Sequence, residues 1–193
     1  MITQIIGRLV EKTPTQVVID CNGVGYAVHI SLHTFSQIGN DEIIKLYTHL
    51  QIREDAHTLF GFHTPMERSV FLLLLSVSGI GASTARTMLS SLEPQQIQRA
   101  IVSEDLNTIK SVKGIGLKTA QRVLIELKDK MMNLFDGEAI QILGNNTIKD
   151  EALSALEVLG YSRKQSERIV DGIIQSTPDC SVEELIKEAL NKL

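Results

Sequence analysis

A glycine-centred stretch of fourteen residues occurs twice in the chain. SVSGIGASTARTML begins at Ser76, and SVKGIGLKTAQRVL begins thirty-five residues later at Ser111, with eight of the fourteen aligned positions identical. Because glycine adopts positive φ and has no Cβ, each Gly-Ile-Gly can turn the chain sharply between two helices. The repeat therefore predicts an all-α segment built from two copies of one helical hairpin.

The second copy has the features of a phosphate site. A helix beginning near Leu117 would present unpaired backbone N–H groups at the positive end of its dipole. Lys118 and Arg122 are four residues apart, so they would share one face of that helix, while Ile115 plugs the turn into the core. A single hairpin of this kind could equally be a structural cap. Two copies favour phosphate binding, and the pair could hold both strands of a duplex without reading its sequence.

Other glycine motifs fit less well. GIGLKT lacks the glycine and lysine spacing of a P-loop, and GIGLKTA follows a predicted helix where a dinucleotide fingerprint follows a strand. We therefore expect no ATP hydrolysis by this chain and no cofactor.

Charge is distributed unevenly along the chain. Residues 64–132 contain nine basic and six acidic side chains, whereas residues 1–63 and 149–193 carry net charges of −2 and −3. Only the segment with the repeats is positive, although the whole chain has a net charge of −4. This pattern favours a local anion-binding module between acidic neighbours.

The sequence predicts an α+β multidomain protein. Residues 1–63 indicate an OB-type β-barrel of five strands, with β-branched runs at 17–21, 26–30, 42–52 and 58–62 and a tight turn at Asn22–Gly23. Residues 64–132 indicate a tandem helical domain, with Pro65 in a first turn and helices at about 82–91, 94–102, 104–111 and 117–131. Residues 133–148 are expected to be a flexible linker because they are rich in glycine and asparagine.

Residues 149–193 predict a three-helix (UBA-like) domain. Gly160 is placed as a helix C-cap, and Ser162 with Gln165 and Ser181 with Glu184 have capping-box spacing.

The remaining composition points to a cytoplasmic protein. The only cysteines, Cys21 and Cys180, are too far apart to suggest a disulfide framework, and the five histidines lack metal-site spacing. No apolar run approaches the ~20 residues of a membrane span, and no signal peptide is visible.

The shared pattern S-V-x-G-I-G-x-x-T-A is similar to the helix-hairpin-helix motif of DNA-binding proteins that do not read sequence. Together with IGRLVEKTPTQVVIDCNGVGY, REDAHTLFGF and ALEVLGY, the tandem pair resembles the RuvA family of Holliday-junction-binding proteins over nearly the whole chain. The resemblance implies a homotetramer, or two, that holds a four-way junction open for branch migration in recombination and repair. It also implies two partners: the hexameric motor ATPase RuvB, on the C-terminal domain, and the resolvase RuvC.

Three sets of candidate residues follow. The DNA-binding set comprises the hairpin residues Gly79, Gly81, Thr84, Arg86, Gly114, Gly116, Lys118, Thr119 and Arg122. Glu54 and Asp55 match the acidic pin of the family. The candidate motor-binding surface comprises Leu159, Gly160, Tyr161, Ile169 and Ile173, each of which could instead belong to the core of a small bundle.

The first hairpin departs from the family pattern. Ser83 stands where the family often has a lysine, and Thr87 aligns with Arg122, which leaves Arg86 as the only cation in that helix. We therefore expect the second hairpin to carry more of the charge-driven affinity.

Two other functions compete with this interpretation. A DNA-repair glycosylase or nuclease could use tandem hairpins for docking, but the acids after Arg122, Glu126 and Asp129, lie on a helix that the sequence predicts to be solvated. A single-strand-binding barrel would need aromatic stacking platforms, and the barrel segment offers only two tyrosines and three phenylalanines.

Overall fold

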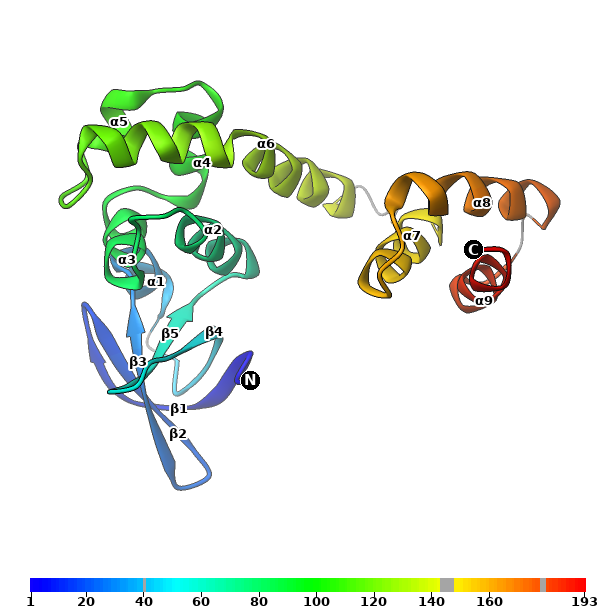
Figure 1. Ribbon diagram of the computed structural model, residues 1–193. Coiled ribbons are helices and arrows are strands. Elements are labelled where there is room, and N and C mark those ends of the chain that lie inside the picture. The colour runs from blue at the N-terminus through cyan, green and yellow to red at the C-terminus, as the bar shows by residue number, and fades with distance from the viewer. Residues whose placement is uncertain (40, 143–147, 178–179) are drawn as a thin grey trace. The chain divides into compact units, whose positions relative to one another are not determined.

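The computed structural model describes the backbone of residues 1–39, 41–142, 148–177 and 180–193, and the side chains of these residues except 136–142, 150 and 175. The chain forms two compact units, Met1–Phe135 and Asp136–Leu193. The first unit contains a β-barrel and the helices of the repeat, and the second contains the three C-terminal helices (Figure 1).

The barrel is closed by five strands: β1 (Gln4–Thr13), β2 (Gln16–Cys21), β3 (Val24–Ile30), β4 (Ile43–Ile52) and β5 (His57–Phe62). Their order around the barrel is β1-β2-β3-β5-β4, and all neighbours are antiparallel except β3 and β5. This confirms the predicted barrel. Strand β1 and the short helix α1 (Leu32–Gln37) lie outside the runs predicted from β-branched residues. Six of the ten residues of β1 are exposed, so its sequence has no continuous apolar run.

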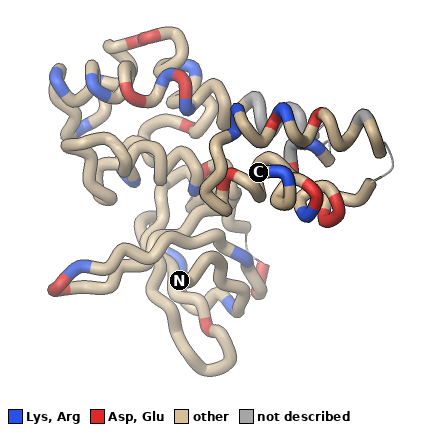
Figure 2. The backbone as a smooth tube through the Cα atoms, turned by 45° about the vertical axis from the view of Figure 1, so that its right-hand side comes forward, with Lys and Arg blue, Asp and Glu red and all other residues tan. Residues whose placement is uncertain are grey.

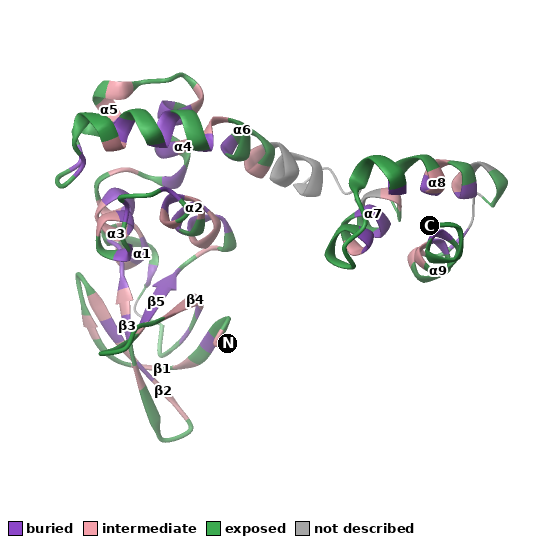
Figure 3. Cartoon of the chain, viewed as in Figure 1, coloured by how far each residue is buried: buried purple, intermediate pink, exposed green. Residues whose placement is uncertain are grey.

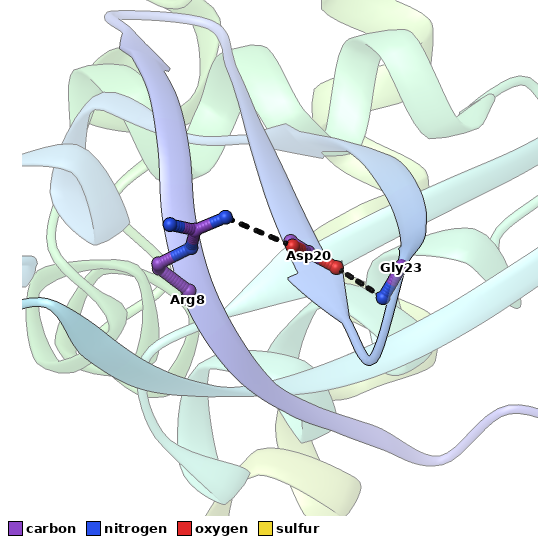
Figure 4. Close-up of polar contacts among 3 residues, drawn as sticks. All are labelled: Arg8, Asp20 and Gly23. Atoms are coloured by element: carbon purple, nitrogen blue, oxygen red, sulfur yellow. Dashed lines mark hydrogen bonds and ion pairs between the residues drawn. The ribbon is translucent and has the colours of Figure 1, made fainter.

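The predicted turn between β2 and β3 is present. Asn22 and Gly23 have φ values of 55° and 90°, as a tight hairpin turn requires. Asp20 Oδ1 accepts a hydrogen bond from the Gly23 amide at 2.7 Å, and Oδ2 accepts one from Arg8 Nη2 of β1 at 3.1 Å (Figure 4). The Gly23 amide, and then Arg8, lower the pKa of the Asp20 carboxyl from its ordinary value. A charged carboxylate thus joins the turn to the neighbouring strand.

Five helices follow the barrel: α2 (Pro65–Leu75), α3 (Ala82–Ser91), α4 (Pro94–Val102), α5 (Leu106–Lys110) and α6 (Leu117–Ile142). The bounds of α3 and α4 agree with the prediction. Helix α5 begins later than the predicted residue 104, because Asp105 caps it by accepting from the amides of Asn107 and Thr108 and Glu104 has a positive φ of 57°.

The expected linker at 133–148 begins inside a helix. Helix α6 continues to Ile142, eleven residues beyond the predicted end at 131. One glycine inside a helix costs only about 1 kcal/mol, and residues 133–142 are otherwise tolerant of helix. Residues 143–147 of the expected linker lie outside the described residues.

The barrel and the tandem hairpins share a hydrophobic core. Phe60 and Phe62 from β5 pack against Phe71 of α2, with ring centroids 5.3 and 4.8 Å apart. Figure 3 shows the buried residues running from the strand ends into α2 and α3. Segments 1–63 and 64–132 therefore pack as one unit.

A buried carboxylate reinforces this junction. Glu67, in the first turn of α2, is fully buried. It accepts hydrogen bonds from the hydroxyls of Ser31 and Thr34 at 2.5 and 2.6 Å and from the backbone N–H of His63 at 3.1 Å. A buried charge is tolerated only when it is hydrogen-bonded in this way, so α1, α2 and the end of β5 are held together at one point.

The second unit consists of α7 (Ile148–Val158), α8 (Arg163–Ser176) and α9 (Val182–Lys192) around a small apolar core. Gly160 has φ 97° and ends α7 as predicted. The capping box of Ser181 and Glu184 is formed. The predicted box at Ser162 is wrong, because its hydroxyl donates to Gln165 Oε1 at 2.8 Å and gives no side-chain cap to α8.

Candidate nucleic-acid interface

The two copies of the repeat have the same backbone geometry. Each turns at its first glycine, Gly79 and Gly114, with φ of 97° and 93°. In each, the isoleucine amide donates to the carbonyl of the valine three residues earlier, at 3.0 Å for Ile80 and 3.1 Å for Ile115. Both isoleucine side chains are buried in the shared core. The sequence identity of the repeats is therefore matched by identical turns.

The second glycine of each copy precedes a helix and leaves its first amides accessible. The first backbone bond of α3 runs from the Ala85 amide to the Gly81 carbonyl, and that of α6 runs from Ala120 to Gly116, both at 2.9 Å. The three amides before each alanine have no intrahelical acceptor in such an arrangement. A Cβ added at Gly81 or Gly116 would meet no atom within 4 Å, so the space in front of these amides is open. Each hairpin thus has room for a phosphate oxygen.

Lysines surround the second hairpin. Lys118 lies in the first turn of α6, Lys113 lies in the loop, and Lys110 ends α5, and all three are exposed. At the first hairpin, the corresponding positions Ser83 and Ser78 are exposed but uncharged. More exposed positive charge therefore lies at the second hairpin, and its larger share of the affinity stays a prediction.

The two hairpins touch each other. Arg122 Nη1 donates a hydrogen bond to the carbonyl of Ser78 in the first hairpin, at 2.9 Å. A Cβ added to Gly79 would lie 3.8 Å from Thr119 Oγ1 in α6. Thr119 and its counterpart Thr84 are both half-buried. The repeat therefore forms one surface with two turns beside each other.

Arg86 is bound to the barrel. Its Nη1 donates to the Thr15 carbonyl at 3.2 Å and lies 3.3 Å from His29 Nδ1, which must accept because a guanidinium only donates. Burial, and then the charge of Arg86, lower the pKa of His29 from its ordinary value. This link from the first hairpin's helix to the barrel could not be found from sequence, since 71 residues separate Arg86 from Thr15.

Glu54 and Asp55 occupy the tip of the β4–β5 hairpin. The turn is closed by a hydrogen bond from the Arg53 amide to the Ala56 carbonyl at 2.9 Å, and both acidic side chains are exposed. Figure 2 shows this acidic tip at the end of a hairpin that extends from the barrel. The structure therefore keeps the pair away from the two glycine turns as a separate feature.

The candidate motor-binding residues divide into surface and core. Leu159 and Tyr161 are exposed by 57% and 37%, on either side of the exposed Gly160. Ile169 is half-buried and lines a shallow hollow with Tyr161. Ile173 is only 1% exposed, so its assignment to the surface is wrong: it belongs to the core of the bundle.

Family models and curated relatives match the chain in the same order as its structural parts. A model described as the RuvA N-terminal domain matches residues 1–61, one for a SAM-like helix-hairpin-helix tandem matches residues 71–129, and one for the RuvA C-terminal domain matches residues 147–193. Relatives named Holliday junction branch migration complex subunit RuvA are 58% identical in Flavobacterium psychrophilum, 55% in Christiangramia forsetii and 47% in Bacteroides fragilis, each match covering the whole of both chains.

The chain belongs to the RuvA family. The family identity agrees with the two glycine turns and disfavours the interpretation as a repair-enzyme docking module. The acid that follows the second hairpin, Glu126, pairs with Arg122 at 3.7 Å, as expected for a solvated helix.

The barrel's aromatic residues do not form a stacking platform. Phe60 and Phe62 lie in the core, and Phe35 and Tyr47 are half-buried beneath the ammonium groups of Lys12 and Lys45. Tyr26 is also half-buried, against the barrel core. A barrel that binds single strands would need exposed rings on which bases stack. The described part of the chain also contains no helix of the length and apolarity needed to cross a membrane, and no cluster of metal-ligating side chains.

Proposed function

We propose that this chain binds four-way DNA junctions by their phosphates and acts as the DNA-holding subunit of a branch-migration complex. The observation that carries the proposal is the pair of identical glycine turns, each opening onto the unpaired first amides of a helix. Backbone amides and lysines contact phosphates irrespective of base sequence. Recognition therefore depends on the shape of the DNA.

The function requires several copies around one junction, and we propose a homotetramer. The outer face of the barrel carries exposed apolar side chains, with Ile6 of β1 54% and Ile43 of β4 68% exposed. In the register of these strands Ile43 lies opposite Arg8, and Ile6 opposite Lys45. The register places Ile6 and Ile43 on the same face of the β1–β4 pair, and we propose this face as the self-association surface. Two tetramers would enclose the junction from both sides.

The chain itself supplies no motor in this proposal. ATP hydrolysis belongs to the hexameric partner RuvB, which contacts Leu159, Gly160 and Tyr161 of the second unit, and RuvC resolves the junction. The complex works in the cytoplasm, where its DNA substrate lies. Leu159 and Tyr161 are exposed and do not belong to the buried core of the second unit. Exposed apolar side chains that the core does not use support a protein contact there.

The test is a binding comparison between a four-way junction and a linear duplex of the same arm sequence, over a series of salt concentrations, with the mass of the complex measured in solution. Junction affinity should exceed duplex affinity throughout and fall steeply with salt, because each phosphate contact releases counterions. Equal affinity for junction and duplex would refute the proposal.

Two lysine variants of α6 test whether the phosphate contact lies at the second hairpin. Lys118→Ala should weaken junction binding by about 1–2 kcal/mol, as the loss of a charge-assisted contact does. Lys130→Ala removes the same charge from the same helix, twelve residues and about 18 Å along α6. Its effect should be small, since it lies beyond the screening length at physiological salt.

A further inference from the structure

Arg122 belongs to the predicted phosphate-binding set, but its guanidinium is engaged within the protein. Nη1 donates to the Ser78 carbonyl at 2.9 Å. Nε lies 3.7 Å from Glu126 Oε1, one turn further along α6. The side chain is 49% exposed, so the charge is near the surface but already has an acidic partner. These contacts engage two of the three guanidinium nitrogens of Arg122 within the protein.

The carbonyl that Arg122 contacts lies at the point where the first hairpin turns. Ser78 immediately precedes Gly79, whose φ is 97°. Thr119, one turn before Arg122 on α6, lies beside the same glycine. The first turns of α6 therefore support the loop of the other hairpin at two neighbouring positions.

The support runs in one direction only. Thr87 occupies the position in the first hairpin that aligns with Arg122, and its hydroxyl donates to the Ser83 carbonyl of its own helix at 2.9 Å. A threonine is too short to reach across to the second loop. Among the described residues, the first copy of the repeat therefore makes no contact at this position equivalent to that of Arg122.

We propose that Arg122 is a positioning residue that fixes the first hairpin's loop to the second hairpin's helix and so sets the spacing of the two phosphate sites. The proposal rests on the proposed function, because the distance between the two turns matters only if both turns bind the same DNA molecule. Phosphates along a duplex have fixed separations. Two phosphate sites on a protein therefore bind one duplex well only when the distance between the two sites is already fixed in the free protein. The charge-driven part of the affinity then comes from the lysines around the second hairpin.

The first test needs no DNA. The variant Arg122→Met with Glu126→Gln removes the donor and keeps the net charge. Hydrogen exchange of the Ile80 amide, which is bonded to Val77, should become about tenfold faster as the first loop loosens. The Ile115 amide makes the equivalent bond in the second hairpin and serves as the internal control. Unchanged exchange at Ile80, or equal acceleration at both amides, would overturn the proposal.

The second test separates positioning from phosphate contact. Junction affinity of the double variant should fall roughly fivefold, while the slope of log affinity against log salt stays that of the unmodified chain. Lys118→Met is the comparison, and it should reduce that slope by about one contact, or 0.9. If the double variant reduces the slope equally, Arg122 is a phosphate ligand and the inference fails. If Lys118→Met leaves the slope unchanged, the proposed hairpin function fails instead, and the exchange result still decides the role of Arg122.

Discussion

At the scale of single residues, the two glycines of each hairpin have different tasks. Gly114 has φ 93°, a conformation that disfavours any residue with a Cβ. Gly116 has no such requirement, and a Cβ there would enter open space. The first glycine is thus needed for the fold, and the second is needed only if something approaches it closely.

This division gives a prediction that separates folding from binding. Gly114→Ala should lower the free energy of unfolding by about 1–2 kcal/mol through backbone strain. Gly116→Ala should leave the melting temperature nearly unchanged and weaken junction binding, because its methyl group occupies the space a phosphate needs. Melting curves and junction titrations of both variants check this. Normal junction binding by Gly116→Ala would show that no phosphate approaches the second glycine.

Some of the residues of the candidate site can be predicted from the sequence, and others cannot. The glycine turns and Lys118 follow from local spacing, and the structure keeps them where the pattern predicts. The partners of Arg86 and Arg122 are carbonyls at Thr15 and Ser78, 71 and 44 residues away. No local pattern encodes a contact with a main-chain carbonyl, because every residue has one. Glu67 looks like an ordinary acid in a first helical turn, because its hydroxyl partners Ser31 and Thr34 are 36 and 33 residues away in the sequence.

At the scale of elements, those with a strong local signal are predicted best. Helices α3 and α4 have the predicted bounds, since a glycine or a proline marks each start. Strand β1 and helix α1 are missed because their stability comes from neighbours: β1 from pairing with β2 and β4, and α1 from packing beside Glu67. Helix α6 is longer than predicted because a single glycine is a weak helix breaker.

The contact of α1 and β5 with α2 through Glu67 can be tested directly. Glu67→Gln preserves the shape of the side chain but replaces one acceptor oxygen with an NH₂ donor, which would face hydroxyls or an amide that need an acceptor. We expect a loss of about 1–3 kcal/mol in the free energy of unfolding of the first unit. Glu42→Gln, an exposed acid on the same unit, is the control and should be nearly neutral. Equal denaturant midpoints for the two variants would contradict the expectation.

At the scale of the whole molecule, the division into two units separates two activities. All candidate DNA contacts lie in Met1–Phe135, and the candidate motor surface lies in Asp136–Leu193. A chain ending at Asn146 should therefore retain junction affinity and lose its stimulation of the motor's ATPase and branch migration. Leu159→Ser in the full chain should weaken stimulation without changing junction affinity, because Leu159 is exposed and outside the small core. Full stimulation by the shortened chain would place the motor contact in the first unit.

The effect proposed for the acidic hairpin tip belongs to this same scale, because it depends on several copies meeting at one junction. In the proposed tetramer, four copies of Glu54 and Asp55 face the strands that change partners. Carboxylates so placed would repel phosphates and oppose binding, and we expect them to keep the centre open and direct separated strands outward to the glycine turns. Repulsion is screened beyond about 8 Å at physiological salt, so the tip must reach the crossover itself. The turn at Arg53–Ala56 is exposed and closed by a hydrogen bond, so no other described part of its own unit covers the tip.

Neutralising the tip should therefore tighten binding. The double change Glu54→Gln, Asp55→Asn is expected to keep the fold, raise junction affinity, and increase duplex affinity at low salt even more, because an unbranched duplex could then cross the centre. Motor-driven branch migration should change in rate as the centre loses its repulsion. Asp41→Asn, Glu42→Gln is the matched control, since it removes the same charge from another exposed acidic pair of the barrel segment. A local role at the crossover is supported only if the tip variant gains DNA affinity and the control variant does not. Equal gains from both double variants would reduce the effect to net charge, and unaltered affinities would make the tip an ordinary solvated turn.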